Sequence, residues 1–81
     1  MNSPTTAARV RKIIAEHLGV IDDAMTDDAH IFDDLGADSL DAIELTIALE
    51  VEFEAEITDD EMASLGTIAD IVAMVDGKVG K

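Results

Sequence analysis

Ser39 is the residue of this sequence with the clearest chemical potential. It lies in the run Leu35–Asp41, which reads LGADSLD, where a loop is expected to turn into a helix with Asp38 as N-cap. The free N–H groups and positive dipole end of such a helix would favour a phosphodiester on the hydroxyl. No base lies close by in sequence, so we expect a serine that another protein modifies. An ordinary helix-start serine is the alternative.

Two histidines are the other candidates for acid–base chemistry. His17 is expected to pack beside the apolar stripe of the first helix, near the helix end that favours a cation. His30 lies in an acidic loop and is expected to have a local charge or hydrogen-bonding role. Neither indicates a triad with Ser39, and the Gly-x-Ser-x-Gly elbow of esterases is absent. We therefore expect no catalytic residue and no enzymatic activity.

Paired aspartates at 22–23, 27–28 and 33–34 raise the question of a calcium site. They lack the alternating ligands and the central Gly of an EF-hand loop, so weak nonspecific divalent binding is the most that they predict. We expect no metal site. The sequence contains no Cys, so any thioester chemistry would need a thiol that is brought in on a cofactor.

The net charge of -14 is concentrated in the middle of the chain. All 19 Asp and Glu lie within residues 13–77, whereas the five Lys and Arg lie at the two ends. We expect few internal ion pairs, a self-repelling surface and attraction to basic partners, with nucleic acid excluded. A solvated face that only aids solubility is the alternative. The hydrophobic content of 48% is that of a folded domain.

The chain has the length of one small domain, residues 1–81. Helical spacing of apolar residues predicts an all-α fold, a small four-helix bundle with a long first loop and a short third helix. The first helix should span about 4–18, with Ser3 as possible N-cap, Pro4 at its first position and Gly19 as its stop. The loop over 20–37 should contain a short helical turn and be anchored to the core. Its expected anchors are Ile31, Phe32 and Leu35.

The second helix should run from Ser39 to about residue 53. Thr58 and Glu61 predict a capping box for the short third helix, which should end before Gly66. The fourth helix should open at Thr67 and end before residue 77, and no segment predicts a strand. Its expected buried residues are Ile68, Ile71, Val72 and Val75.

The second helix carries apolar residues on two opposite faces. The expected core face consists of Ala42, Leu45, Leu49 and Phe53. The second stripe consists of Leu40, Ile43, Ile47 and Val51, edged by Glu44, Glu50 and Glu54. The third helix or the long loop could cover this stripe. Since so small a bundle cannot easily bury both faces, we favour an exposed docking surface that begins beside Ser39.

The run around Ser39 and the residues after it, up to 57, together resemble the signature of discrete bacterial acyl carrier proteins. The matching positions are Glu44-Leu45, Ala48-Leu49-Glu50, Glu52-Phe53 and Glu56-Ile57, and the resemblance extends over nearly the whole chain. It implies that a pantetheinyl transferase moves 4′-phosphopantetheine from coenzyme A to Ser39. The thiol of that arm would then hold acyl chains as thioesters in fatty acid biosynthesis.

The resemblance also implies a surface that binds acyl-handling enzymes through their basic docking surfaces. Its residues would be Asp38, Leu40, Asp41, Ile43, Glu44, Ile47, Glu50, Val51, Glu52, Asp59 and Asp60. The cargo would lie between helices, lined by Leu49, Phe53, Ile57, Leu65 and Ile71. Val51 stands where typical fatty-acid carriers have a glutamate, which lengthens the apolar stripe and points to a specialised carrier as an alternative to the housekeeping one.

Two further alternatives remain open from the sequence. One is a carrier of polyketide or aminoacyl and peptidyl intermediates, and the other is an acidic interaction module without a prosthetic group. Residues 1–8 lack the layout of a secretory signal, and no apolar run reaches membrane-spanning length. We therefore expect a cytoplasmic monomer with no membrane span.

Overall fold

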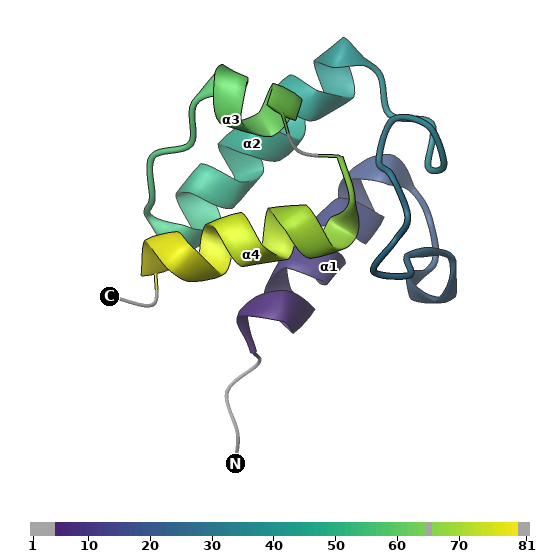
Figure 1. Ribbon diagram of the computed structural model, residues 1–81, viewed down its shortest axis with the longest axis horizontal. Coiled ribbons are helices and arrows are strands. Elements are labelled where there is room, and N and C mark those ends of the chain that lie inside the picture. Colours follow the sequence, from purple (N-terminus) through teal and green to yellow (C-terminus); the bar gives the residue numbers. More distant parts are fainter. Residues whose placement is uncertain (1–4, 65, 80–81) are drawn as a thin grey trace.

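The computed structural model describes residues 5–64 and 66–79, within which four α-helices and no β-strand are found (Figure 1). The helices are α1 (Thr6–Leu18), α2 (Ser39–Phe53), α3 (Asp59–Ser64) and α4 (Ile68–Val79). A short 3-10 turn, η1 (Asp22–Ala24), lies in the long first loop. The predicted all-α bundle is confirmed, with its long first loop, the helical turn in that loop and the short third helix.

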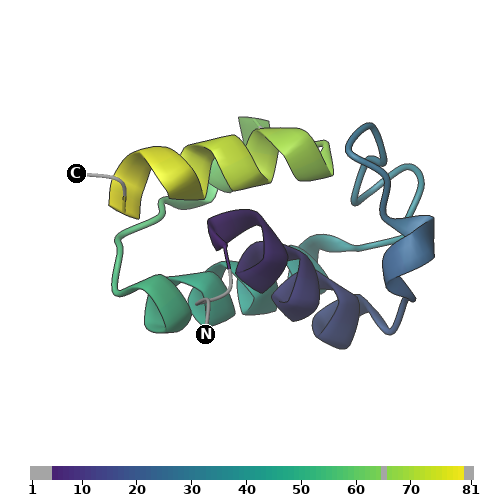
Figure 2. The same cartoon turned by 90° about the horizontal axis from the view of Figure 1, so that it is seen from below.

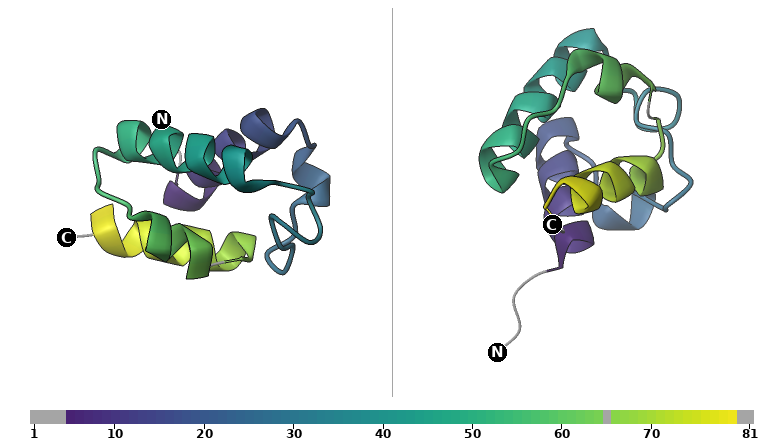
Figure 3. Two further views of the ribbon diagram at one scale, coloured as in Figure 1. Left: turned by 90° about the horizontal axis from the view of Figure 1, so that it is seen from above. Right: turned by 60° about the vertical axis from the view of Figure 1, so that its left-hand side comes forward.

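Helix α1 packs against both α2 and α4, and α3 packs against α2. Figure 2 shows α4 on one side of the molecule and α2 on the other, with α1 between them. In the right-hand view of Figure 3, α3 lies beside the N-terminal half of α2. The short third helix therefore flanks the part of α2 that begins at Ser39.

Helix α1 begins one residue after Thr5, whose Oγ1 accepts a hydrogen bond of 3.0 Å from the N–H of Ala8. Ser3 and Pro4, the predicted cap and first residue, lie outside the described residues. Gly19 ends the helix as predicted, with the positive φ of 68° that favours glycine. The prediction for His17 was wrong, because its side chain is exposed in the last turn. The fully buried residues of α1, Val10 and Ile14, lie two turns and one turn earlier.

Helix α4 begins at Ile68, after Thr67, whose Oγ1 accepts a hydrogen bond of 3.1 Å from the N–H of Asp70. Three of its four predicted core residues are fully buried, whereas Val72 is only partly buried. The predicted end before residue 77 was wrong. The helix continues to Val79, which packs against the core, because tertiary contacts outweigh the cost of about 1 kcal/mol for a glycine inside a helix.

The long first loop belongs to the core rather than to the surface alone. Ile31 is completely buried, as predicted, and Phe32 and Leu35 are partly buried. Met25 is also completely buried, which no pattern in the sequence predicted. Backbone hydrogen bonds attach this loop to the start of α4, including Ile31 N–H to the carbonyl of Gly66 at 2.8 Å. The loop that leads to Ser39 is thus held by both packing and hydrogen bonds.

Candidate functional site

Ser39 is the first residue of α2, and its side chain is exposed. Asp38 caps the helix as predicted: its Oδ1 accepts from the N–H of Asp41 at 2.9 Å, and Oδ2 of Asp41 accepts from the N–H of Asp38 at 3.1 Å. Before the cap, the N–H of Ala37 donates to the carbonyl of Ile31 at 2.8 Å. These bonds hold the serine hydroxyl at the surface, at the positive end of a 15-residue helix.

A pocket of about 190 Å³ opens beside Ser39, between α2, α3 and the long loop. It is lined by Phe32, Ser39, Ala42, Ile43, Thr46, Met62 and Ala63. Within the described residues, the only polar side chains in this lining are those of Ser39 and Thr46, and the hydroxyl of Thr46 donates to the carbonyl of Ala42 at 2.7 Å. The pocket therefore offers an apolar space next to the serine.

The predicted lining of a cargo site differs from the lining of this pocket. Leu49, Phe53, Ile57 and Ile71 are buried core residues, and none of them lines it. Leu65 lies outside the described residues. A cargo site lined by these four residues stays a prediction, since their burial places them between the helices. The pocket lies instead on the flank where α3 meets Ala42 and Thr46.

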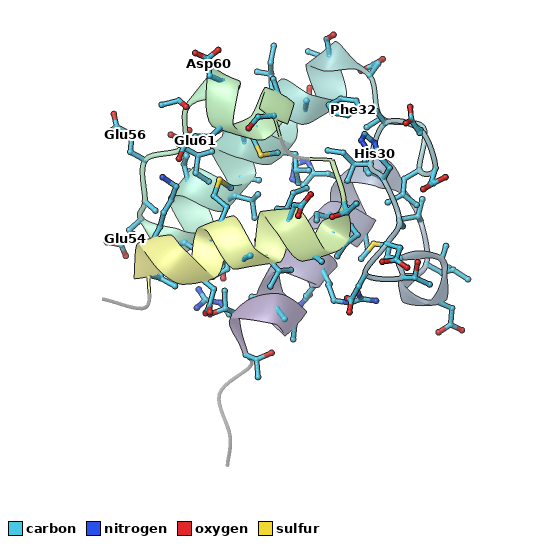
Figure 4. The ribbon with its side chains drawn as sticks, viewed as in Figure 1. His30, Phe32, Glu54, Glu56, Asp60 and Glu61 are labelled. Carbon is cyan, nitrogen blue, oxygen red and sulfur yellow. The ribbon has the colours of Figure 1, made fainter. Side chains whose placement is uncertain are left out.

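His30 holds the segment that supplies Phe32 to this pocket. Its Nδ1 accepts hydrogen bonds of 3.3 Å from the N–H groups of Phe32 and Asp33, so the ring proton is on Nε2 in this arrangement. The N–H of His30 itself donates to Oδ2 of Asp34 at 2.8 Å. The rings of His30 and Phe32 lie side by side, with their centroids 5.9 Å apart (Figure 4). The predicted hydrogen-bonding role of His30 is confirmed.

The second apolar stripe of α2 is exposed, as favoured above. Leu40, Ile43, Ile47 and Val51 have 61%, 49%, 54% and 74% of their surface accessible. Helix α3 flanks the pocket through Met62 and Ala63 and leaves the stripe uncovered. The alternative, in which α3 or the long loop buries the stripe, is therefore wrong.

The carboxylates beside the stripe differ in ways that the sequence did not predict. Glu44 is exposed and forms no ion pair or side-chain hydrogen bond within the described residues. Glu50 instead accepts a hydrogen bond of 3.0 Å from the N–H of Ile57, which closes the connection between α2 and α3. Glu52 forms an ion pair of 2.8 Å with Arg9 of α1. Glu50 and Glu52 therefore have contacts within the chain, whereas the side chains of Glu44 and the exposed Glu54 have none within the described residues.

Helix α3 also contributes acids to this side of the molecule. Asp60 is exposed and points away from the bundle (Figure 4), whereas the side chain of Asp59 lies outside the description. Glu61 forms an ion pair of 3.0 Å with Lys78 and accepts from the N–H of Thr58, which confirms the capping box. The hydrogen bond from the backbone of Thr58, followed by that from Lys78, lowers the pKa of Glu61.

The basic residues at the chain ends reach into the acidic middle more than the composition predicted. Arg9, Lys78 and Arg11 each pair with an acid there, the last with Asp27 at 3.6 Å. Among residues 5–64 and 66–79, no group of three or more acidic, histidine or cysteine side chains could hold a metal ion. Within the same residues, no helix is both long and apolar enough to cross a membrane.

Comparisons with known proteins agree with this geometry. The family model described as a phosphopantetheine attachment site matches residues 8–75. An acyl carrier protein of Zymomonas mobilis subsp. mobilis is 52% identical over 71 residues, covering 88% of this chain and 91% of that protein. The solved structure of a thermally stable acyl carrier protein from Enterococcus faecalis matches with a TM-score of 0.77 and 34% identity, covering 90% of this chain and 92% of the other. The chain therefore belongs to the bacterial acyl carrier proteins, which carry a covalently attached 4′-phosphopantetheine.

Proposed function

We propose that Ser39 is the residue that carries the 4′-phosphopantetheine and that the cargo is a fatty acyl chain. The observation that supports the attachment site is the exposed hydroxyl of Ser39 at the first position of α2. The dipole of that helix stabilises the charge of a phosphodiester. The group thus fits this site, and its thiol supplies the thioester chemistry that a chain without Cys cannot perform.

The pocket beside Ser39 supports a hydrocarbon cargo. Phe32, Ile43 and Met62 present apolar surface there, and burying the first carbons of an acyl chain against them is favourable. Polyketide intermediates carry more oxygens, for which this lining offers few partners. We therefore favour fatty acyl cargo over polyketide or aminoacyl cargo.

The chain acts in this proposal as a carrier in the cytoplasm rather than as an enzyme. No hydrogen bond joins Ser39 to a histidine or carboxylate within the described residues, so the hydroxyl has no base of its own. Modification then depends on a pantetheinyl transferase, and delivery depends on enzymes whose basic surfaces meet the acidic side of α2 and α3. The chain is proposed to meet these partners as a monomer.

Intact-mass measurement tests the attachment site directly. The protein is incubated with coenzyme A, Mg²⁺ and a pantetheinyl transferase, and we expect the mass of one phosphopantetheine to be added. Ser39→Ala should gain nothing. Ser64→Ala is the matched control, since Ser64 is also an exposed helical serine, and it should be modified like the parent. A parent without added mass, or a modified Ser39→Ala protein, would refute the proposal.

A further inference from the structure

The pocket beside Ser39 has two walls that are built differently. Met62 and Ala63 come from α3, a helix of six residues, whereas Phe32 comes from the long first loop. A residue in a loop usually makes a mobile wall, because few contacts hold it. The contacts of Phe32 with the rest of its loop lead instead to one side chain, the imidazole of His30.

His30 is held from two sides. On the side of the loop, its N–H donates to Oδ2 of Asp34 at 2.8 Å, and its carbonyl accepts from the N–H of Asp34 at 2.8 Å. On the side of α4, its backbone pairs with that of Thr67 in an antiparallel bridge. Its ring lies directly against Gly66, where a Cβ would be only 2.0 Å from Nε2. The imidazole therefore has a defined position between the loop and the segment that starts α4.

His30 in turn holds Phe32 through the same ring. Its Nδ1 accepts from the N–H groups of Phe32 and Asp33, both at 3.3 Å. The two rings are tilted by 51° with their centroids 5.9 Å apart, a separation at which tilted aromatic pairs attract each other (Figure 4). Within the described residues, the structure gives these two N–H groups no other acceptor. The place of Phe32 in the pocket thus depends on the imidazole.

We propose that His30 is a positioning residue for the cargo, because it holds Phe32 as a fixed wall against which the hydrocarbon of an acyl chain is buried. A wall that stays in place excludes water from the hydrocarbon that it covers, which slows the attack of hydroxide on the attached thioester. This inference rests on the proposed function, since it concerns the acyl chain on the arm of Ser39. A long acyl chain depends on His30, whereas an acetyl group, which offers almost no hydrocarbon to bury, does not.

Amide hydrogen exchange, followed by NMR on the protein without its prosthetic group, tests the contacts of His30. His30→Leu removes the acceptor, so the N–H groups of Phe32 and Asp33 should exchange about fivefold faster. His30→Asn supplies a side-chain oxygen that can accept from the same N–H groups, and it should restore slow exchange. His17→Leu is the matched control, because His17 is exposed at the end of α1, and it should change nothing. Equal exchange in the parent and in His30→Leu would overturn the inference.

The effect on the cargo is measured as the rate of thioester hydrolysis at mildly alkaline pH. A pantetheinyl transferase loads the protein from octanoyl-coenzyme A or acetyl-coenzyme A, and hydroxide then releases the carboxylate and the thiol of the arm. We expect the octanoyl form of His30→Leu to hydrolyse about fivefold faster than that of the parent. The rate of the acetyl form should not change, and the octanoyl form of His30→Asn should be close to the parent.

Phe32→Leu separates positioning from a general loss of stability. It should itself accelerate hydrolysis of the octanoyl form, and His30→Leu should add nothing in that background, because the ring to be positioned is absent. A role of His30 in stability alone predicts that the two effects add and that octanoyl and acetyl forms are affected equally. Either of those results would overturn the inference. If His30→Leu does not fold, an unchanged rate in Phe32→Leu would still overturn it. A parent that takes up no acyl group would refute the proposed function itself.

Discussion

Gly66 and His30 are expected to constrain each other, and Gly66→Ala tests how rigid the loop beside the pocket is. A Cβ at position 66 would overlap the imidazole of His30, where even the Cε1 atom would be only 2.8 Å away. The ring cannot turn aside freely, because Nδ1 accepts from the N–H groups of Phe32 and Asp33. The backbone is held as well, since the carbonyl of Gly66 accepts from Ile31 at 2.8 Å.

The expected change in the free energy of unfolding for Gly66→Ala is the balance of two opposing effects of the added methyl group. Overpacking costs about 1–3 kcal/mol of the free energy of unfolding. Gly66 does not have a positive φ, so alanine is otherwise compatible with its backbone and would stabilise by about 0.4–1 kcal/mol through the unfolded chain. We therefore expect Gly66→Ala to destabilise the parent by about 1–2 kcal/mol. That loss corresponds to a fall in Tm of about 4–8 °C for each kcal/mol.

The effect of Gly66→Ala on the free energy of unfolding should change sign when the imidazole of His30 is removed. In a His30→Asn background, a shorter side chain can still accept the N–H groups of the following residues, and the space beside Gly66 is empty. Gly66→Ala should then stabilise by about 0.4–1 kcal/mol. Urea unfolding of the parent, the two single variants and the double variant, followed by circular dichroism, gives the coupling energy. An equal loss in both backgrounds would refute the proposed overlap with the imidazole.

Three other predictions concern stability. Leu49→Ala should lower the free energy of unfolding by about 2–5 kcal/mol in urea titrations, because Leu49 is completely buried. Ile47→Ala, two residues away and 54% exposed, should change it by less than about 0.5 kcal/mol, and a large loss would show that the second stripe is core. The pKa of Glu61 is lowered by Thr58 and Lys78 from 4.5, so its stabilising contribution is present above pH 4.5 and is lost as the pH falls through the lower folded value. Melting curves should therefore show a smaller loss of Tm between pH 7 and acid for Glu61→Gln than for the parent, and identical losses would contradict this assignment.

Local patterns in the sequence were sufficient to predict the helices, apart from the end of α4, and the position of Ser39 at the start of α2. Helical spacing, the Asp38 cap and the stop at Gly19 involve residues only a few positions apart, and the structure confirms them. The two apolar faces of α2 could also be predicted, because helix periodicity assigns each residue to a face. A helix of 15 residues in a domain of this size then leaves one face exposed.

The tertiary structure alone decided which acids remain available and where the pocket opens. Glu52 meets Arg9 across 43 positions, and His30 meets Gly66 across the whole of α2 and α3. No local pattern encodes such pairs, because they depend on how α1, α2 and the long loop pack together. The acidity of the chain therefore follows from its composition alone. The pairing of Glu52 with Arg9 arises only when α1 places its arginine beside the end of α2.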